Sequence, residues 1–309
     1  MPQAEVSTAA KHTFPPPTPE PKVDEVKGWQ TKLSPAVVTL LVFMLMQGLG
    51  SIAVVALAVW LSPDFNEAIG DLTGRGLPNL EAIPASTFAL MLMASNILAV
   101  LVCRYLLHYI RFVTASDVAS IRWQHALLAL AAGMTAAFGT SILTDDLELP
   151  DAMQRMTMAM ANDTLGLVAL VIVGPITEEL LIREAIAGEM LRRKANPWLA
   201  IIVSAIAFSI AHLNLAQGLY ALPLGIIFGI IYCKTGNILL TSILHIINNA
   251  SAAFQIRFFG EELDSTTFTE ILGGPCQAIA VAATLGLISA TLTYFLWNSP
   301  SAETIPKNK

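Results

Sequence analysis

Long uninterrupted apolar segments constrain the fold of this chain more than any other feature. A helix needs about 20 apolar residues to cross the hydrocarbon core of a bilayer, and a chain in lipid must satisfy its own backbone hydrogen bonds. Hydrophobic residues make up 55% of the sequence and charged residues only 13%, whereas soluble domains are about 25% charged. We therefore predict an all-α membrane protein, a polytopic bundle of about eight transmembrane helices.

The apolar segments are separated by polar breaks that are mostly short, as expected for packed antiparallel helices. The fifth and sixth segments are short, and we expect that they do not cross the full bilayer or that their joining loop lies inside the protein. The predicted spans are 35–61, 86–107, 124–143, 164–190, 197–213, 218–233, 237–256 and 275–297.

Both ends of the chain are polar. Residues 1–32 are rich in proline and cannot bury a core, so we predict a disordered cytoplasmic tail without a cleavable signal peptide. Residues 33–298 form the predicted transmembrane domain, and residues 299–309 a short C-terminal tail.

The placement of Lys and Arg predicts the orientation. With the N-terminus inside, thirteen of the 17 basic residues lie in cytoplasmic segments, three lie outside, and Arg183 lies within a span. This bias predicts a multi-pass protein of the cell membrane with both termini in the cytoplasm. The net charge of −6 argues against a nucleic-acid partner. The three cysteines, Cys103, Cys233 and Cys276, are interpreted as small apolar packing residues.

Charged and polar side chains inside the spans are the candidates for chemistry, because their burial in lipid is costly. Any one of these residues could equally have only a structural role in helix packing. A purely structural role for all of them would require three separate helices each to bear this cost, which favours a functional role. The candidates are Glu178, Glu179 and Arg183 in the fourth span, Phe208 and His212 in the fifth, and His245 and Asn249 in the seventh.

Helix geometry assigns these side chains to faces, since residues four apart lie on one face. Glu179 and Arg183 are so spaced and are predicted to pair, while Glu178 points about 100° away. The pairs Phe208 and His212, and His245 and Asn249, have the same spacing, so each pair can reach one point in the bundle. Other polar residues are interpreted as interfacial or as solvating helix ends: His108, His125, Glu184, Glu189, Arg192 and Arg193.

Taken in order, Glu178-Glu179-x-x-x-Arg183, Phe208-x-x-x-His212 and His245-x-x-x-Asn249 resemble the three-motif signature of the CPBP family. These are the CAAX-processing and bacteriocin-processing intramembrane proteases, also called the Abi family, which includes the Ras-converting CAAX endopeptidase. The resemblance covers about residues 160–255, and all motif positions match.

The resemblance implies an endopeptidase that hydrolyses peptide bonds of membrane-associated proteins or peptides. Glu178 and His212 would then activate the hydrolytic water, and His245 and Asn249 would complete the site and stabilise the oxyanion. Glu179, Arg183 and Phe208 would support it. The residue chemistry agrees with such a reaction, which needs a base for water and donors for the developing oxyanion.

The residues leave the metal requirement open. Glu178, His212 and His245 could hold zinc or another divalent metal with water in the fourth position, although the HExxH motif is absent. The same residues suit a metal-free glutamate mechanism equally well. The predicted span limits also place Glu178 nearer the inner face and His212 nearer the outer face, although the two must meet if they share a water molecule.

Two other classes of function fit the intramembrane Glu and His residues. A membrane transporter or proton-relay protein would use them without cleaving peptides, and a non-catalytic scaffold would retain them as structure. The oligomeric state is open as well. Gly225 and Gly229 form a GxxxG pattern, which more often permits close packing within one chain than dimerisation.

Overall fold

The computed structural model describes residues 33–61, 84–111, 113–145, 147 and 153–299. All regular elements in these ranges are helices. Seven of the helices are long and apolar enough to cross a membrane. They are α1 (Ser34–Leu61), α3 (Ala85–Leu101) with its π-helical continuation η2 (Val102–Leu106), α5 (Trp123–Asp145), the composite helix Thr164–Arg192, α11 (Leu215–Thr235), α12 (Ile238–Ser265) and α14 (Pro275–Asn298). The chain is thus a multi-pass integral membrane protein.

The structure corrects the prediction of about eight spans, because the fifth predicted segment is too short to cross the membrane. That segment forms α10 (Pro197–Ala211), which has only 15 residues. At 1.5 Å per residue it covers roughly 22 Å, less than the hydrocarbon core of about 30 Å. The sixth segment, expected to be short, is the 21-residue helix α11. The expectation that α10 does not span the full bilayer agrees with its length.

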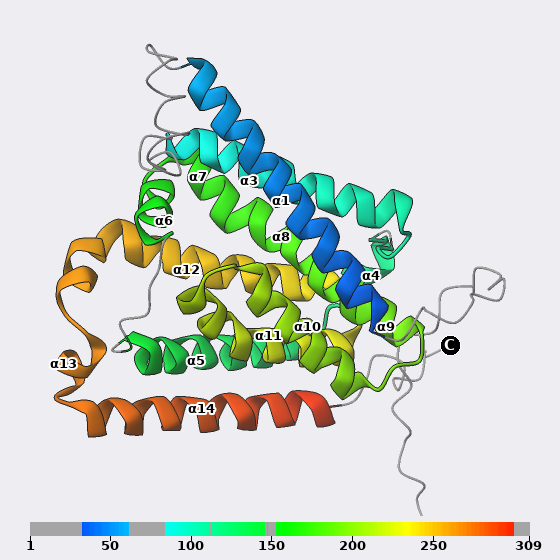
Figure 1. Ribbon diagram of the computed structural model, residues 1–309. Helices are drawn as coiled ribbons and strands as arrows, with labels where there is room; N and C mark the ends of the chain where they lie inside the picture. The colour runs from blue at the N-terminus through cyan, green and yellow to red at the C-terminus, as the bar shows by residue number, and fades with distance from the viewer. Residues whose placement is uncertain (1–32, 62–83, 112, 146, 148–152, 300–309) are drawn as a thin grey trace, which may run out of the picture.

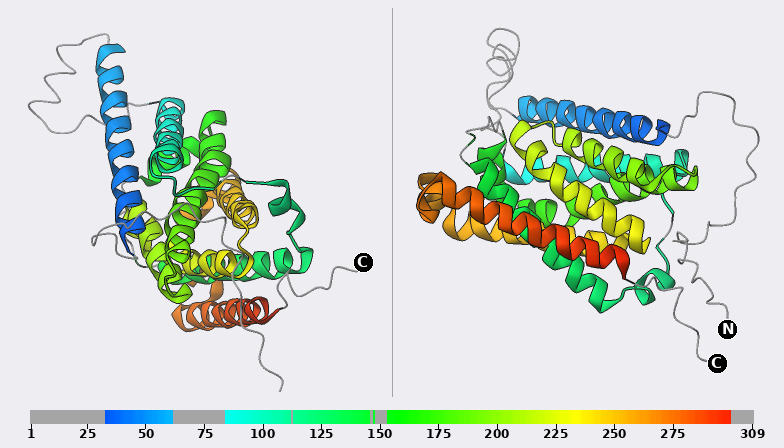
Figure 2. Two further views of the ribbon diagram at one scale, coloured as in Figure 1. Left: turned by 90° about the vertical axis from the view of Figure 1, so that its right-hand side faces the viewer. Right: turned by 90° about the horizontal axis from the view of Figure 1, so that it is seen from below.

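The helices form two outer groups around a central one (Figures 1 and 2). Helices α1 and α3 lie on one side of the bundle, and α5 and α14 lie together on the opposite side. Helices α8 (Gly174–Glu179), α10, α11 and α12 lie between them. The three predicted motifs all fall on these central helices, so the fold brings them into the interior.

The composite helix changes its pitch four times, and one of these changes falls inside the first motif, between Glu179 and Leu180. Its segments are α7 (Thr164–Leu167), η3 (Val168–Val173), α8, η4 (Leu180–Gly188) and α9 (Glu189–Arg192), of which η3 and η4 are π-helical. Pro175 stands at the start of α8 and brings no backbone N–H. Wide π-helical turns are rare and are frequent at functional sites, because they release carbonyl groups from the regular ladder.

Helices α10 and α11 form a tight hairpin. Leu213 adopts a left-handed φ of 51°, and the Asn214 side chain caps α11 by accepting from the N–H groups of Ala216 and Gln217. A Cβ atom at Gly225 would lie 3.0 Å from the Cα atom of Ala205 in α10.

The small residues of the GxxxG pattern thus serve packing within the chain. A Cβ atom at Gly229 would likewise lie 3.2 Å from a side-chain carbon of Ile201 in α10. The close approach of the two helices therefore requires residues without a side chain at these positions.

A buried charge cluster joins η4 to Arg111, which precedes α4 (Ala115–Ala119), and to α9 and α11. The Glu184 side chain is fully buried, at 2.8 Å from Arg111 and 3.4 Å from Arg192, and it accepts a hydrogen bond from the Tyr232 hydroxyl. The interpretation of Glu184 as a solvated helix-end residue is therefore wrong. Glu189, by contrast, pairs with Arg193 at 2.8 Å in the expected i,i+4 spacing.

Three smaller predictions have mixed outcomes. Cys103 and Cys233 are buried as expected, but Cys276 is exposed at the start of α14. His125 is buried and lies 2.8 Å from the Ser299 hydroxyl, so it is not a purely interfacial residue. The predicted tails, 1–32 and most of 299–309, lie outside the described residues.

Candidate active site

The two neighbouring glutamates at the end of α8 occupy different environments. Glu179 is completely buried and pairs with Arg183 one turn later, with 3.1 Å between the carboxylate and Nε. The Glu178 side chain retains 27% exposure. The structure therefore confirms the sequence-based division into a buried Glu179–Arg183 pair and a Glu178 that points elsewhere.

His245 of α12 contacts both carboxylates through its two ring nitrogens. Its Nδ1 atom lies 3.2 Å from Oε1 of Glu179, and its Nε2 atom lies 3.7 Å from Oε2 of Glu178. A carboxylate can only accept, so the neutral ring is expected to donate its Nδ1 proton to Glu179. The free lone pair of Nε2 then faces Glu178.

In the neutral Nδ1–H tautomer, Nε2 of His245 and the Glu178 carboxylate are two proton acceptors that face each other. At 3.7 Å they are too far apart for a direct hydrogen bond. A water molecule that donates to both groups would resolve the conflict, since polar contacts beyond about 3.5 Å are commonly bridged by water. The arrangement therefore suits a water molecule held by a partly exposed carboxylate and an oriented imidazole.

Aromatic rings enclose the buried part of the site. The Arg183 guanidinium lies 5.2 Å from the centre of the Phe208 ring and 5.9 Å from that of Phe228. The same two rings each lie 5.6 Å from the His245 ring. This packing stabilises a buried cation by cation–π attraction and restrains the imidazole. Phe208 was expected here, whereas Phe228 has no sequence signal beyond its apolar span.

His212 directly follows α10 as its C-cap residue and contacts the Phe208 ring. Its ring lies 4.8 Å from the Phe208 ring, as the spacing predicts, and its Nδ1 atom lies 2.8 Å from the Phe208 carbonyl oxygen. That carbonyl can only accept, so the Nε2 atom of neutral His212 keeps its lone pair. Phe208 thus contacts both imidazoles, and the hairpin turn after α10 determines where His212 lies.

Asn249 of α12 is held against the composite helix. Its Nδ2 atom donates to the Leu170 carbonyl oxygen in η3 at 3.0 Å, and its Oδ1 atom accepts from Asn248 at 3.2 Å. In the i→i−5 spacing of a π-helix, the residue that would bond to the Leu170 carbonyl is Pro175, which has no N–H. The amide keeps a second N–H for another acceptor.

The three ligands expected for a metal are not assembled. Over the described ranges, no three His, Cys, Asp or Glu side chains come close enough together to hold a metal ion. Glu178 and His245 face each other, whereas His212 contacts the Phe208 ring and the Phe208 carbonyl oxygen. The geometry of these residues therefore does not fit a three-ligand centre.

Sequence reasoning missed Asn248 and Tyr220. The Tyr220 hydroxyl of α11 donates to Oδ1 of Asn248 at 3.4 Å, and Asn248 in turn donates to Asn249. Asn248 directly precedes a motif residue, which is the one signal that could have drawn attention to it. Tyr220 has no such signal, because its contact depends on the packing of α11 against α12.

The fold and the site define a polytopic helical membrane protein with a carboxylate–imidazole site inside its bundle. Residues 160–251 match the model of the type II CAAX prenyl endopeptidase Rce1-like family. The chain is also similar to a protein of Bacillus subtilis (strain 168) named "Putative membrane peptidase YdiL", with 32% identity over 107 residues. These matches confirm the predicted resemblance to the CPBP family of intramembrane proteases.

The match to the relative is partial, covering 33% of this chain and 43% of the relative's length. It includes neither the whole of this bundle nor the whole of the relative. No solved structure matches the chain.

Proposed function

We propose that this protein is an intramembrane endopeptidase that hydrolyses peptide bonds through a water molecule activated by Glu178. The observation that carries the proposal is the partly exposed Glu178 carboxylate facing Nε2 of His245 at 3.7 Å, while buried Glu179 orients the opposite ring nitrogen. The family matched over residues 160–251 and the similarity to a putative membrane peptidase support the same class of reaction.

In the proposed reaction, Glu178 accepts one proton from the water molecule, and the water oxygen bonds to the carbonyl carbon of the scissile peptide. The carbonyl electron pair moves to oxygen, where the second N–H of Asn249 is a candidate donor to the oxyanion. The C–N bond then breaks, and the leaving nitrogen takes the proton from Glu178. His212, which contacts the Phe208 ring at 4.8 Å, supplies a second proton acceptor.

The proposed substrate is a membrane-associated peptide or protein tail, because the site lies on the central membrane helices. A C-terminal CAAX-type tail or a processed peptide or surface protein fits this class. We propose that the protein lies in the cell membrane with both termini in the cytoplasm, as the basic residues predict.

The test is cleavage of a fluorogenic peptide library, including prenylated tails, by purified protein in liposomes. Wild type is compared with Glu178→Gln and His212→Ala, and with Glu189→Gln as a matched control at the end of the same composite helix. Loss of cleavage in the first two variants and its retention in the control support the proposal. Cleavage that survives in both site variants would overturn the site assignment.

The same assay is run with and without a strong chelator. Cleavage that is lost with the chelator and restored by a divalent metal assigns a metal-dependent mechanism, and unchanged cleavage assigns the glutamate mechanism. A folded wild type that cleaves nothing across the library would contradict the peptidase proposal.

A further inference from the structure

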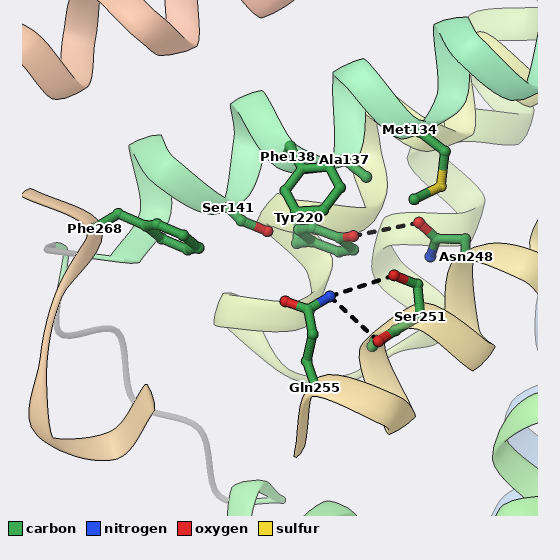
Figure 3. A pocket seen from close by; sticks show the side chains of 10 residues that line it. Met134, Ala137, Phe138, Ser141, Tyr220, Asn248, Ser251, Gln255 and Phe268 are labelled. Carbon is green, nitrogen blue, oxygen red and sulfur yellow. Dashed lines mark hydrogen bonds between the residues drawn. The ribbon is translucent and has the colours of Figure 1, made fainter. Parts of the chain in front are cut away.

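A hollow lined by uncharged polar side chains lies next to the Asn248–Asn249 pair (Figure 3). It lies between α5, α11, α12 and the short helix α13 (Phe268–Leu272). Its polar groups are Ser141, Tyr220, Asn248, Ser251 and Gln255. Met134, Phe138 and Phe268 are among its apolar residues. Its lining contains no ionisable group other than the tyrosine hydroxyl.

The polar groups of the hollow are only loosely paired with one another. The Tyr220–Asn248 hydrogen bond measures 3.4 Å, and Gln255 donates to the Ser251 carbonyl and hydroxyl oxygens of its own helix at 3.2 and 3.4 Å. These distances are long for hydrogen bonds, whose usual range ends near 3.2 Å. The Tyr220 hydroxyl also has a hydrogen bond with Ser141. Long, weak hydrogen bonds of this kind can be exchanged for bonds to a ligand or to water at little cost.

The hollow leads toward the imidazole of the candidate active site. A second, smaller hollow shares Met134 and Asn248 with it and is also lined by Phe228 and Leu244. The Phe228 ring lies 5.6 Å from the His245 ring. The two hollows therefore lie one after the other in space, between Phe268 and the wall of the active site, along the contact between α5 and α12.

We propose that the hollow is a substrate subsite that accepts one uncharged, hydrogen-bonding residue of an extended peptide close to the scissile bond. Asparagine, glutamine and serine side chains offer the donors and acceptors that this lining matches. A charged side chain would lose its hydration without gaining an ion pair. This subsite rests on the proposed peptidase function and adds the chemistry of the residue that it selects.

The test uses nine-residue fluorogenic peptides that carry Gln, Glu, Lys or Leu at each position flanking the cleaved bond. At one position wild type should prefer Gln over Glu by about tenfold in kcat/KM, the effect of one or two hydrogen bonds. Ser141→Phe places a ring in the hollow and should raise KM for the Gln peptide about tenfold. The value of kcat should stay within about twofold, since the residues at the reacting bond are unchanged.

Two further variants keep the test decisive. Leu143→Phe adds the same ring size on an exposed face of α5 and should change neither KM nor the preference. Gln255→Leu removes a donor without adding volume and should weaken the preference for Gln even if Ser141→Phe folds poorly. The subsite would be overturned if Gln255→Leu kept the preference for Gln over Glu and folded Ser141→Phe kept the KM of wild type. These results would mean that the hollow holds water only.

Binding separates the two proposals. Fluorescence anisotropy measures the affinity of the same peptides for the Glu178→Gln protein, alone and combined with Ser141→Phe. If the wild type cuts no peptide but Ser141→Phe weakens peptide binding, the subsite is retained and the peptidase proposal is contradicted. Cleavage that is indifferent to every hollow variant would contradict the subsite alone. Neither cleavage nor binding would contradict both.

Discussion

The Nδ1 atom of His245 lies 3.2 Å from the carboxylate of Glu179, which is itself paired with Arg183 at 3.1 Å. Three side chains from two helices thus form one buried chain of contacts. This chain orients the imidazole so that its other nitrogen faces Glu178. We propose that the two neighbouring glutamates have separate tasks, with buried Glu179 positioning the ring and the partly exposed Glu178 holding the water molecule.

The first prediction separates those two tasks. Glu178→Gln should lower kcat by about 10²–10⁴, because a general base is lost while the packing remains. Glu179→Gln should instead destabilise the fold by about 3–5 kcal/mol, because it leaves Arg183 buried without its counter-charge. Thermal unfolding in detergent, measured beside peptide cleavage, checks both. An equally large loss of stability in the two variants would contradict this division.

The second prediction concerns the cost of the buried ion pair itself. A double replacement, Glu179→Leu with Arg183→Met, should be more stable than either single variant, because neither charge is left unpaired. The double variant should still lack activity, since His245 loses the acceptor that orients it. The unfolding midpoints of the three variants in one detergent give the comparison. A double variant no more stable than the singles would show that the pair is not energetically coupled.

The third prediction concerns Asn249. Asn249→Ala should lower kcat by about 10²–10³ with a smaller effect on KM, as for loss of an oxyanion donor. Tyr220→Phe should reduce activity far less, because its 3.4 Å bond to Asn248 acts on Asn249 only indirectly. Steady-state kinetics on one fluorogenic peptide measures both. A change in KM alone for Asn249→Ala would assign this residue to ground-state binding.

The fourth prediction tests the packing of the α10–α11 hairpin. Gly225→Ala should cost about 1–3 kcal/mol, because its Cβ atom would press on the backbone of Ala205 at 3.0 Å. Gly286→Ala in α14 is the matched control, since its Cβ atom would meet nothing within 4 Å. Unfolding midpoints compare the two variants. Equal tolerance would mean that the hairpin separates easily, and a changed oligomeric state in Gly225→Ala would instead indicate a dimer contact.

The fifth prediction concerns Asp117, which lies outside the spans. Burial disfavours its charge, but hydrogen bonds from the Thr114 N–H and hydroxyl, and then Arg111, outweigh it and hold the pKa of Asp117 below its usual value. A lowered folded-state pKa stabilises the protein above the unfolded-state pKa, and this stabilisation is lost as the pH falls further. Wild type should therefore exceed Asp117→Asn in unfolding midpoint at pH 7.

The difference between wild type and Asp117→Asn should shrink as the pH falls below about 4, where an unperturbed Asp takes up its proton. Other carboxylates titrate in the same range, so the difference between the two proteins is the relevant quantity. A difference that stays constant from pH 7 to pH 3 would contradict an ionised, hydrogen-bonded Asp117.

The sequence by itself determined the class of fold and most residues of the candidate site. Apolar segments of bilayer length have only one backbone solution in lipid, so the helical bundle follows from composition and length. Residues four apart on one helix must share a face, and for that reason the Glu179–Arg183 and Phe208–His212 contacts were predictable. The motif spacing also identified His245 and Asn249 before any helix was placed.

Only the tertiary structure decided which groups meet across helices. Periodicity carries no information about the separation of two helices, so the contacts of His245 with both glutamates and of Asn249 with the Leu170 carbonyl could not be derived. The same holds for the contacts of the Phe208 ring with both imidazoles, and for Glu184, whose arginine partner 73 residues away makes its burial tolerable. Those contacts depend on packing, where side chains distant in sequence determine the cost of burying each charge.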